Sequence, residues 1–496
     1  MIPLNSAPSS RFEAYLLYAA IAVLLAAAVS GMVEPIDSIF QLVPRDYNEG
    51  WNAFWSDIAV AGGRLYPPPD STVANNYPPL SFYLIGALGH VIGDNIIAGR
   101  LVATLSLAAI AVNIFLWTRA AGASRRIATF GAALFLAMFA AYAPAYIALD
   151  DPQLMAHAIM LSGVTLLLRG RLSTRALVGA SLLMILGGLT KHLLLPLPLA
   201  TTAWIALYRR DKLPVWIGSS VVLLGTSIGV IWMCYGMAFF DNMSAGRSYS
   251  EHLASNAVHR LINDLGWVLL VITAVVLAFE RRRTLRKLKE SAALGLLYLV
   301  LSAIVDALAS GGAGVDRNAY FDFVIAACVC ATLGLESIRG RNLIIGITIR
   351  GAPVAAVLGL AVGIMLAFQA AARVPSEWHE LQRGPLREAE ASAAIRLIER
   401  AGRGHAACEM LALCYWAKDE FTVDFYNFGQ KLALHSLPPS ACESVFIDGR
   451  ITMLQLDRQP AGSQLNNRLP ELCNQVISSH FSVVQESSLG SLMTRR

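Results

Sequence analysis

The sequence predicts a mainly α-helical, polytopic membrane protein with a small α/β domain at its C-terminal end. Of its 496 residues, 56% are hydrophobic and only 15% are charged, a balance unlike that of soluble globular proteins. Long apolar runs recur along most of the chain, and basic residues fall between them. Because these basic residues form no single stripe with interleaved aromatics, the net charge of +5 indicates membrane topology and no nucleic-acid partner.

About eleven apolar runs approach the length of a membrane-spanning helix, which is about 20 residues for a hydrocarbon core of about 30 Å. The first lacks the basic segment of a cleavable signal peptide, so we expect it to be retained. Segment 79–92 is apolar but short, and we expect a helix that lies in the membrane interface. The expected spans are residues 12–31, 98–118, 127–147, 152–168, 176–190, 193–208, 214–238, 262–280, 291–309, 319–337 and 352–372.

The positions of Lys and Arg predict the orientation, because cytoplasmic loops carry an excess of both. With a cytoplasmic N-terminus, every predicted cytoplasmic loop is basic, whereas counting segment 79–92 as a span would invert this agreement. The loop residues are Arg119, Arg125, Arg126, Arg169, Arg171, Arg175, Arg209, Arg210, Lys212, Arg281, Arg282, Arg283, Arg286, Lys287, Lys289, Arg339, Arg341 and Arg350.

Two domains follow from this orientation in a cell inner (plasma) membrane. Residues 1–372 form the transmembrane domain, with a first periplasmic loop at 32–97, and residues 373–496 form a periplasmic domain. In that oxidising compartment, Cys408, Cys414, Cys442 and Cys473 allow up to two disulfides in three possible pairings. Cys234, Cys328 and Cys330 lie in apolar runs and are expected to be small buried side chains, and the spacing of the seven cysteines matches no zinc site.

The first outer loop carries the first candidate catalytic carboxylates. Asp46 and Glu49 are three residues apart and share one face of a short helix that begins there. One carboxylate would act as general base toward an acceptor hydroxyl while the other positions it. The alternative is structural, with Asp46 as N-cap and Glu49 at the third helical position.

A second acidic site, Asp150-Asp151-Pro152, lies on the same predicted face, between the third and fourth spans. These carboxylates would bind a cation or accept a proton, although Asp-Asp-Pro also ends one helix and begins the next. Two acidic sites on one face favour the functional interpretation. Cationic groups on that face would stabilise an anionic leaving group such as phosphate, although each could instead extend to the interface. These groups are Arg100, Lys191, His192, Arg247 and Arg317.

Several short motifs then occur in an order that resembles a known family. They are DYNEGWN at 46–52, GGRLYP at 62–67, NYPPL at 76–80, GRL at 99–101, LDDP at 149–152, GVDRNAY at 314–320 and VDFYNF at 423–428. Together they are similar to bacterial membrane glycosyltransferases of the GT-C superfamily, in the branch that is protein O-mannosyltransferase-like and lipid A aminoarabinose transferase-like. The resemblance covers most of the membrane part and, more weakly, the tail.

The resemblance implies a glycosyltransferase of the cell envelope. Its donor would be a polyprenyl-phosphate-linked sugar, and its acceptor a lipid, a glycan or a protein. In that family the first outer loop carries a catalytic carboxylate, commonly in an Asp-Glu pair. Here Asn48 stands where the Asp is expected, so Glu49 matches the second member, Asp46 lies two residues upstream, and both remain candidate bases.

The same resemblance suggests roles for further residues. Arg100 and Lys191 would hold the lipid phosphate, with His192 and Arg317 beside them, while Asn52 and Tyr77 would position the substrate. A divalent cation between Asp150 or Asp151 and the phosphate is compatible with this chemistry but not required by it.

Two other classes of function fit the same sequence. A lipid or solute transporter or flippase would also have many spans, but such proteins often contain inverted repeats with a midplane binding site. The sequence shows no convincing repeat, and its polar candidates lie at one face. In the other alternative, a non-catalytic assembly protein, the tail would bind a partner and the acidic loop would be structural.

Overall fold

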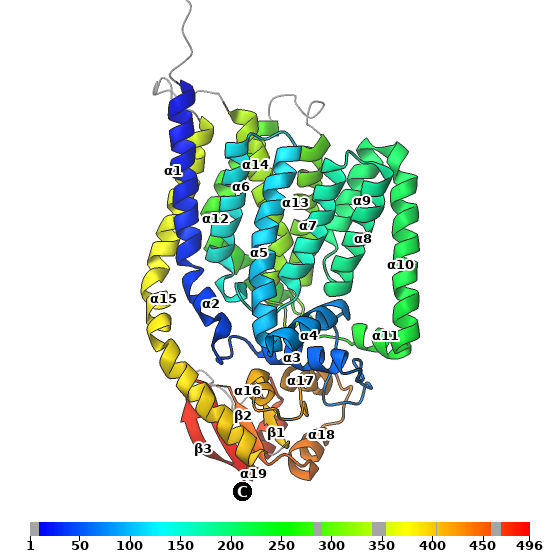
Figure 1. Ribbon diagram of the computed structural model, residues 1–496. Coiled ribbons are helices and arrows are strands. Elements are labelled where there is room, and N and C mark those ends of the chain that lie inside the picture. Colours follow the sequence, from blue (N-terminus) through cyan, green and yellow to red (C-terminus); the bar gives the residue numbers. More distant parts are fainter. Residues whose placement is uncertain (1–8, 281–289, 340–353, 403, 458–467) are drawn as a thin grey trace, which may run out of the picture.

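A bundle of long helices carries a small domain at one end, with short helices lying between the two (Figure 1). The computed structural model describes residues 9–280, 290–339, 354–402, 404–457 and 468–496. The predicted basic loop residues at 281–289, and those at 341 and 350, lie outside the described residues.

Each predicted span overlaps one helix of the bundle. Seven helices of the described chain are long and apolar enough to cross a membrane, and α7 and α8 are shorter apolar helices. The prediction of a polytopic helical membrane fold is therefore confirmed, while the number of spans stays a prediction. The bundle contains α1 (Ser9–Ser30), α5 (Asn95–Ala120), α6 (Arg125–Tyr142), α7 (Gln153–Arg169), α8 (Thr174–Thr190), α9 (Pro196–Tyr208), α10 (Leu213–Tyr235), α12 (Glu251–Glu280), α13 (Glu290–Ala309), α14 (Phe321–Ile338) and the first part of α15 (Val354–Ala401).

Side-chain hydrogen bonds cap the starts of the bundle helices α6 and α8. The Ser124 side chain accepts a hydrogen bond from the Ile127 N–H at the start of α6, and Ser173 does the same for Ala176 at the start of α8. The short helices η2 (Pro144–Tyr146), η3 (Arg210–Lys212) and η5 (Arg317–Tyr320) lie in the connections. The end of α5 and the start of α6, where the first basic loop lies, are far from the C-terminal domain (Figure 1).

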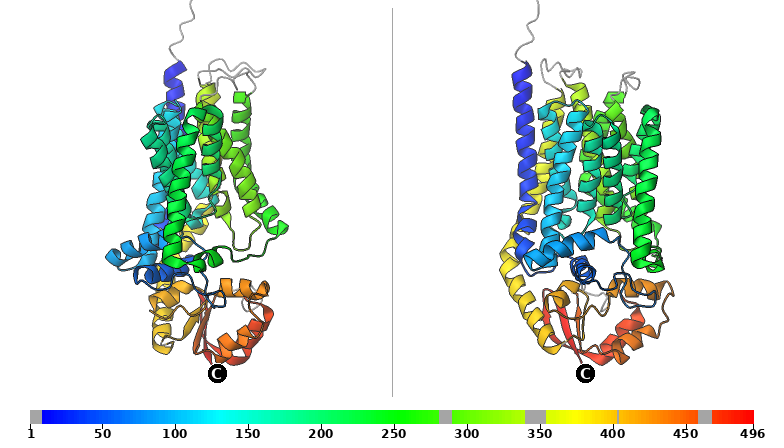
Figure 2. Two further views of the ribbon diagram at one scale, coloured as in Figure 1. Left: turned by 90° about the vertical axis from the view of Figure 1, so that its right-hand side faces the viewer. Right: turned by 45° about the vertical axis from the view of Figure 1, so that its right-hand side comes forward.

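A layer of short helices crosses the end of the bundle that faces the C-terminal domain. It contains α2 (Val33–Asp37), η1 (Ser38–Phe40), α3 (Tyr47–Val60), α4 (Leu80–Ile92) and α11 (Met237–Met243). Helix α4 is the segment predicted to lie in the interface, and it runs across the bundle end instead of along it (Figure 2). It ends at Gly93, whose φ of 96° favours a residue without a Cβ.

One continuous helix, α15, leads from the bundle into the C-terminal domain. It is 48 residues long and contains Pro375 and Pro385, which each remove a backbone donor and favour bending. The predicted domain boundary at 372 falls inside this helix, so it remains a prediction.

The C-terminal domain has the predicted mixed α/β character. Its sheet has the strand order β1-β2-β4-β3, in which β1 and β2 are parallel and the other pairs are antiparallel. Its elements are β1 (Ala406–Cys408), α16 (Leu411–Trp416), α17 (Phe425–Ala433), α18 (Ala441–Glu443), η6 (Ser444–Asp448), β2 (Met453–Leu456), α19 (Glu471–His480), β3 (Phe481–Ser487) and β4 (Gly490–Arg495).

The structure selects one of the three possible cysteine pairings. Cys408 bonds to Cys414, with 5.8 Å between Cα atoms, and Cys442 bonds to Cys473, with 5.1 Å. Cys328 and Cys330 are buried, as predicted. The prediction for Cys234 is wrong: it is exposed, because α10 packs along one side only and turns most of its apolar side chains outward.

We predict that the two ends of the bundle lie on opposite sides of the membrane. Ser173 lies in the connection between α7 and α8, and exposed Ser436 follows α17 in the C-terminal domain. In a bacterial host, a membrane-impermeant maleimide should label Ser436→Cys in spheroplasts but Ser173→Cys only after permeabilisation. Each change is made in a chain with Cys234 replaced by Ala. Labelling of both positions from the same side would contradict the predicted orientation.

Candidate active site

The two acidic segments predicted from the sequence meet at the end of the bundle. The Asn52 side-chain amide on α3 donates to the Asp150 carbonyl at 2.6 Å, joining residues 98 positions apart. The Asp150 N–H in turn lies 3.4 Å from Glu49 Oε1. The start of α3 and the connection between α6 and α7 therefore form one structural unit.

A buried ion pair between Glu49 and Arg100 holds this unit. Arg100 Nε lies 2.7 Å from Glu49 Oε1, Arg100 Nη2 lies 2.7 Å from Glu49 Oε2, and both side chains are 0% exposed. The remaining N–H groups donate to carbonyls of the segment before α3: those of Ser38 and Gln41 at 2.9 Å each and that of Val43 at 2.7 Å. The guanidinium is thus surrounded by protein acceptors and has no direction left for the phosphate that the sequence analysis assigned to it.

The carboxylate oxygens of Glu49 are likewise occupied by protein donors. Besides Arg100, its Oε2 accepts the Arg45 backbone N–H at 2.9 Å. A general base needs a lone pair aimed at the acceptor, and the lone pairs of Glu49 are directed at protein donors. This geometry favours Asp46 as the base.

Asp46 caps α3, as the structural interpretation predicted, and is also chemically suited to be a base. Its carboxylate accepts the Asn48 N–H at 2.8 Å. Burial raises the pKa of Asp46 to about 6, although the Asn48 hydrogen bond and the charge of Arg468 act in the opposite direction. A carboxylate that titrates near 6 is ionised at neutral pH and is still basic enough to take a proton.

The neighbouring carboxylates Asp150 and Asp151 differ in their surroundings. Burial, together with the charges of Glu49 and Asp151, raises the pKa of Asp150 well above its usual range. Asp151 Oδ2 instead lies 3.9 Å from the Lys191 ammonium. That ammonium also lies 3.5 Å from the centre of the Tyr77 ring, a cation–π contact. Lys191, Asp151 and Tyr77 therefore form one cluster.

The other two predicted phosphate ligands, His192 and Arg317, differ in their charge and in their partners. Burial and the charges of Lys191 and Arg247 lower the pKa of His192 to about 4, so this ring is neutral at pH 7 and is not a cationic phosphate ligand. Arg317 pairs with Asp264 on α12 and donates to the Tyr142 carbonyl. These contacts hold Arg317 against the bundle end.

Sequence reasoning missed the contribution of the C-terminal domain. The Arg468 guanidinium lies 5.0 Å from the centre of the Tyr47 ring, beside Asp46, and is ion-paired with Glu409. The Tyr426 ring lies 5.9 Å from that of Tyr47. Tyr426 belongs to the VDFYNF motif, which was a usable signal, whereas no pattern around Arg468 indicated its position.

The described residues do not form a cation cage around Asp150 and Asp151. The described chain contains no group of three or more His, Cys, Asp or Glu side chains placed to hold a metal ion. Asp151 Oδ1 accepts the Gln153 N–H at 2.8 Å, and Oδ2 faces Lys191. Because these contacts occupy the carboxylate with protein donors, we derive no step through a metal.

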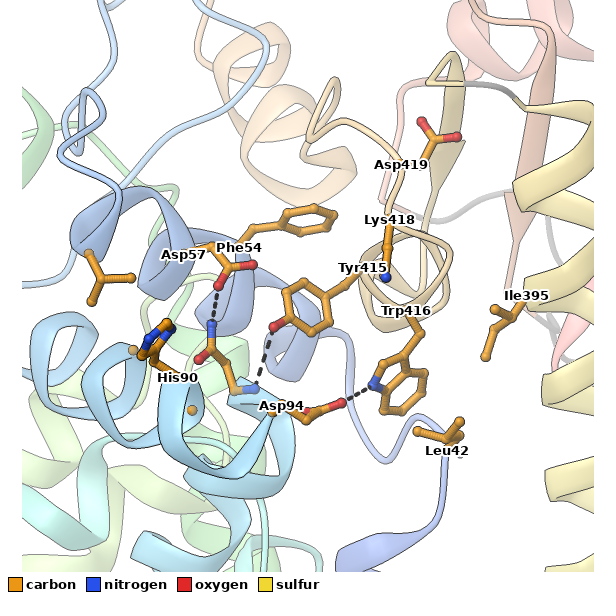
Figure 3. Close-up of a pocket in the computed structure, with 15 residues that line it drawn as sticks. Leu42, Phe54, Asp57, His90, Asp94, Ile395, Tyr415, Trp416, Lys418 and Asp419 are labelled. Atoms are coloured by element: carbon orange, nitrogen blue, oxygen red, sulfur yellow. Dashed lines mark hydrogen bonds between the residues drawn. The ribbon is translucent and has the colours of Figure 1, made fainter.

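A cavity of about 730 Å³ lies near this site, between α3, α4, α5 and α16 (Figure 3). Trp416 separates it from the buried ion pair, since the Arg100 guanidinium carbon lies 6.0 Å from its ring centre and its indole N–H donates to Asp94 at 2.8 Å. The predicted site residues do not line it. The labelled lining residues are Leu42, Phe54, Asp57, His90, Asp94, Ile395, Tyr415, Trp416, Lys418 and Asp419.

Solved structures to which this chain is similar include membrane glycosyltransferases. Undecaprenyl phosphate-bound ArnT from Cupriavidus metallidurans matches with a TM-score of 0.56 at 13% identity, over 95% of this chain and 97% of ArnT. Apo ArnT gives a TM-score of 0.58 at 12% identity over the same shares. The chain has the GT-C fold.

A second GT-C enzyme, from an archaeon, shows the same likeness. The Archaeoglobus fulgidus oligosaccharyltransferase tethered with an acceptor peptide matches with a TM-score of 0.53 at 13% identity, over 96% of this chain and 74% of that one. No protein-family model matches the sequence, and no curated protein matches it significantly. The fold that the GT-C resemblance implied is thus confirmed.

We predict that Glu49→Gln and Arg100→Lys each lower the stability of the GT-C fold strongly. Removing one partner of a buried ion pair costs about 3–5 kcal/mol, because the other charge stays buried without compensation, and Lys cannot replace a bidentate guanidinium. The thermal unfolding midpoint in detergent, followed by tryptophan fluorescence, should fall by several degrees. Arg247→Lys, at a half-buried arginine, is the matched control, and equal midpoints for Arg100→Lys and this control would contradict the role of the pair.

Proposed function

We propose that this chain is a membrane glycosyltransferase that moves a sugar from a polyprenyl-phosphate-linked donor to a hydroxyl of a lipid, glycan or protein acceptor. One observation carries the proposal: the carboxylate of Asp46, which caps α3, feels the charge of Asp151, and Asp151 in turn faces the buried ammonium of Lys191, while α3 itself lies between the helix bundle and the C-terminal domain. The GT-C fold supports it. ArnT was crystallised with undecaprenyl phosphate bound, and the archaeal enzyme with a tethered acceptor peptide.

The location suits the physical chemistry of such a donor. A polyprenyl chain dissolves in the hydrocarbon core, whereas its phosphate and sugar remain at the aqueous edge. Outward-facing apolar side chains along α10, such as Val221, Val222 and Met233, provide a lipid-facing wall. The site lies at the end of this wall, so the headgroup would reach it without leaving the membrane boundary.

Asp46 is the proposed general base. It takes the proton of the acceptor hydroxyl as the acceptor oxygen forms its bond to the anomeric carbon, and the bond from that carbon to the phosphate oxygen breaks. The electron pair of that bond leaves with the lipid phosphate. Lys191, fixed between Asp151 and the face of Tyr77, stabilises the departing negative charge.

The other residues act by positioning. Glu49 and Arg100 hold the segment before α3 against α5, which fixes the start of the helix that Asp46 caps. Asn52 holds the backbone of Asp150, and neutral His192 is left as a hydrogen-bonding group beside Lys191.

We predict that purified full-length protein consumes at least one member of a panel of polyprenyl-phosphate sugars, as measured by mass spectrometry. Asp46→Asn should slow transfer by about 10²–10⁴-fold, because it removes the base, and Lys191→Met should slow it through loss of phosphate stabilisation. Exposed Asp241→Asn and Lys418→Met are the matched controls. If no donor is consumed, the transporter or flippase interpretation takes precedence. Transfer at the parental rate in Asp46→Asn would exclude this residue as the base.

The pH dependence provides a separate test of Asp46. Since the base must be ionised, transfer by the parent chain should rise about tenfold per pH unit below a midpoint near 6 and level off above it. The residual transfer by Asp46→Asn should lack this rising limb. A parental profile that is flat from pH 5 to 8 would contradict the assignment.

A further inference from the structure

A small space lies beside the Asp150-Asp151 turn, where α3, α4, α5 and α7 come together. Its volume is about 10 Å³, close to the minimum of about 10–15 Å³ that one water molecule needs. Ser56 on α3, Ser81 on α4 and Asp150 contribute polar side chains to its wall.

Three residues that line this space each carry a buried polar atom without a partner. Asp150 Oδ2, Ser56 Oγ and Ser81 Oγ have no hydrogen-bond partner among the residues that the structure describes. Their side chains belong to residues that are 3%, 1% and 3% exposed. A buried polar group left without a partner costs about 1–3 kcal/mol, so three in one small space call for a shared partner.

We infer that this space binds a single ordered water molecule, held by Asp150 Oδ2, Ser56 Oγ and Ser81 Oγ. A buried water typically makes about three hydrogen bonds to groups that are otherwise unsatisfied. Each serine hydroxyl can rotate to donate or accept, and a carboxyl oxygen accepts from the water. One molecule therefore satisfies all three atoms.

The composition of the wall argues against a metal ion. Phe82, Ile85, Val102 and Met155 make up much of the remaining lining and supply no oxygen ligands. The lining also includes Asp151 and Asn52, but Asp151 is held by the Gln153 N–H and the Lys191 ammonium, and the Asn52 amide is held by the Asp150 carbonyl. These side chains together with Asp150 and the two hydroxyls fall short of the six or more oxygens that Ca²⁺ or Mg²⁺ takes. The volume leaves no room for additional waters to complete a coordination shell.

The water completes the attachment of the Asp150-Asp151 turn. The turn is already tied to α3 by Asn52, and it approaches α5 so closely that a Cβ at Gly99 would stand 1.9 Å from Asp150 Oδ1. The water adds a link from the Asp150 side chain to α3 and α4 together. On the proposed function, Ser56 and Ser81 are thereby positioning residues for the neighbouring Asp151, which faces Lys191.

A structure of the full chain in lipid nanodiscs, at a resolution that shows ordered water (about 2 Å), tests the binding site. We expect one isolated density peak within about 3.2 Å of all three oxygens, present both in sodium chloride and in choline chloride buffer. An empty space would overturn the inference, and so would a peak that disappears in choline, since that behaviour identifies Na⁺.

Replacing Ser81 by Val tests the positioning role. The added methyl groups should displace the water, and kcat for sugar transfer should fall by about 10²-fold, the effect of a misplacement of about 1 Å, with KM for the donor changing less than twofold. Ser106→Val, at a buried serine of α5, is the matched control. An unchanged kcat overturns the positioning role. If the parent itself transfers no sugar, the proposed function fails, but the density experiment still decides whether the water is bound.

Discussion

The Glu49–Arg100 ion pair is the interaction on which the rest of the site depends. It joins α3, which lies across the bundle end, to α5, which runs through the bundle, and its remaining N–H groups hold the segment between η1 and α3. Two fully buried charges are tolerated only because each is hydrogen-bonded on nearly every side. The pair therefore fixes the start of α3 in one position. Because Asp46 is three residues before Glu49, its position is fixed as well.

Around this anchor, similar carboxylates acquire different chemistry from their surroundings. Glu49 is paired with a guanidinium, Asp151 faces an ammonium, and Asp150 is buried beside other carboxylates, which raises its pKa. Asp46 is intermediate, with a pKa of about 6. Such separation of titration behaviour within one cluster is how a site obtains a base and fixed charges from the same residue types.

The C-terminal domain contributes residues to the candidate site. Helix α15 carries it from the bundle, and α16 packs directly against α3. Tyr415 of α16 lies edge-on to Phe54 at 5.3 Å between ring centres, and Phe421, which follows α16, stacks on Phe54 at 4.8 Å. The two disulfides of the domain tie β1 to α16 and α18 to α19, which fixes these elements relative to one another.

The sequence by itself determined the helical membrane fold, the short helix α4 as a segment apart from the bundle spans, and the capping of α3 by Asp46. These features follow from local signals: apolar run length, cap chemistry and the side of the bundle to which each loop returns. Only the tertiary structure decided that Glu49 is committed to Arg100, that Cys234 faces outward, which cysteines pair and that Arg468 lies beside Asp46. The physical reason is that each of these depends on which side chains meet across long stretches of chain. Hydropathy and spacing set the face on which a residue lies, but they do not set its partner.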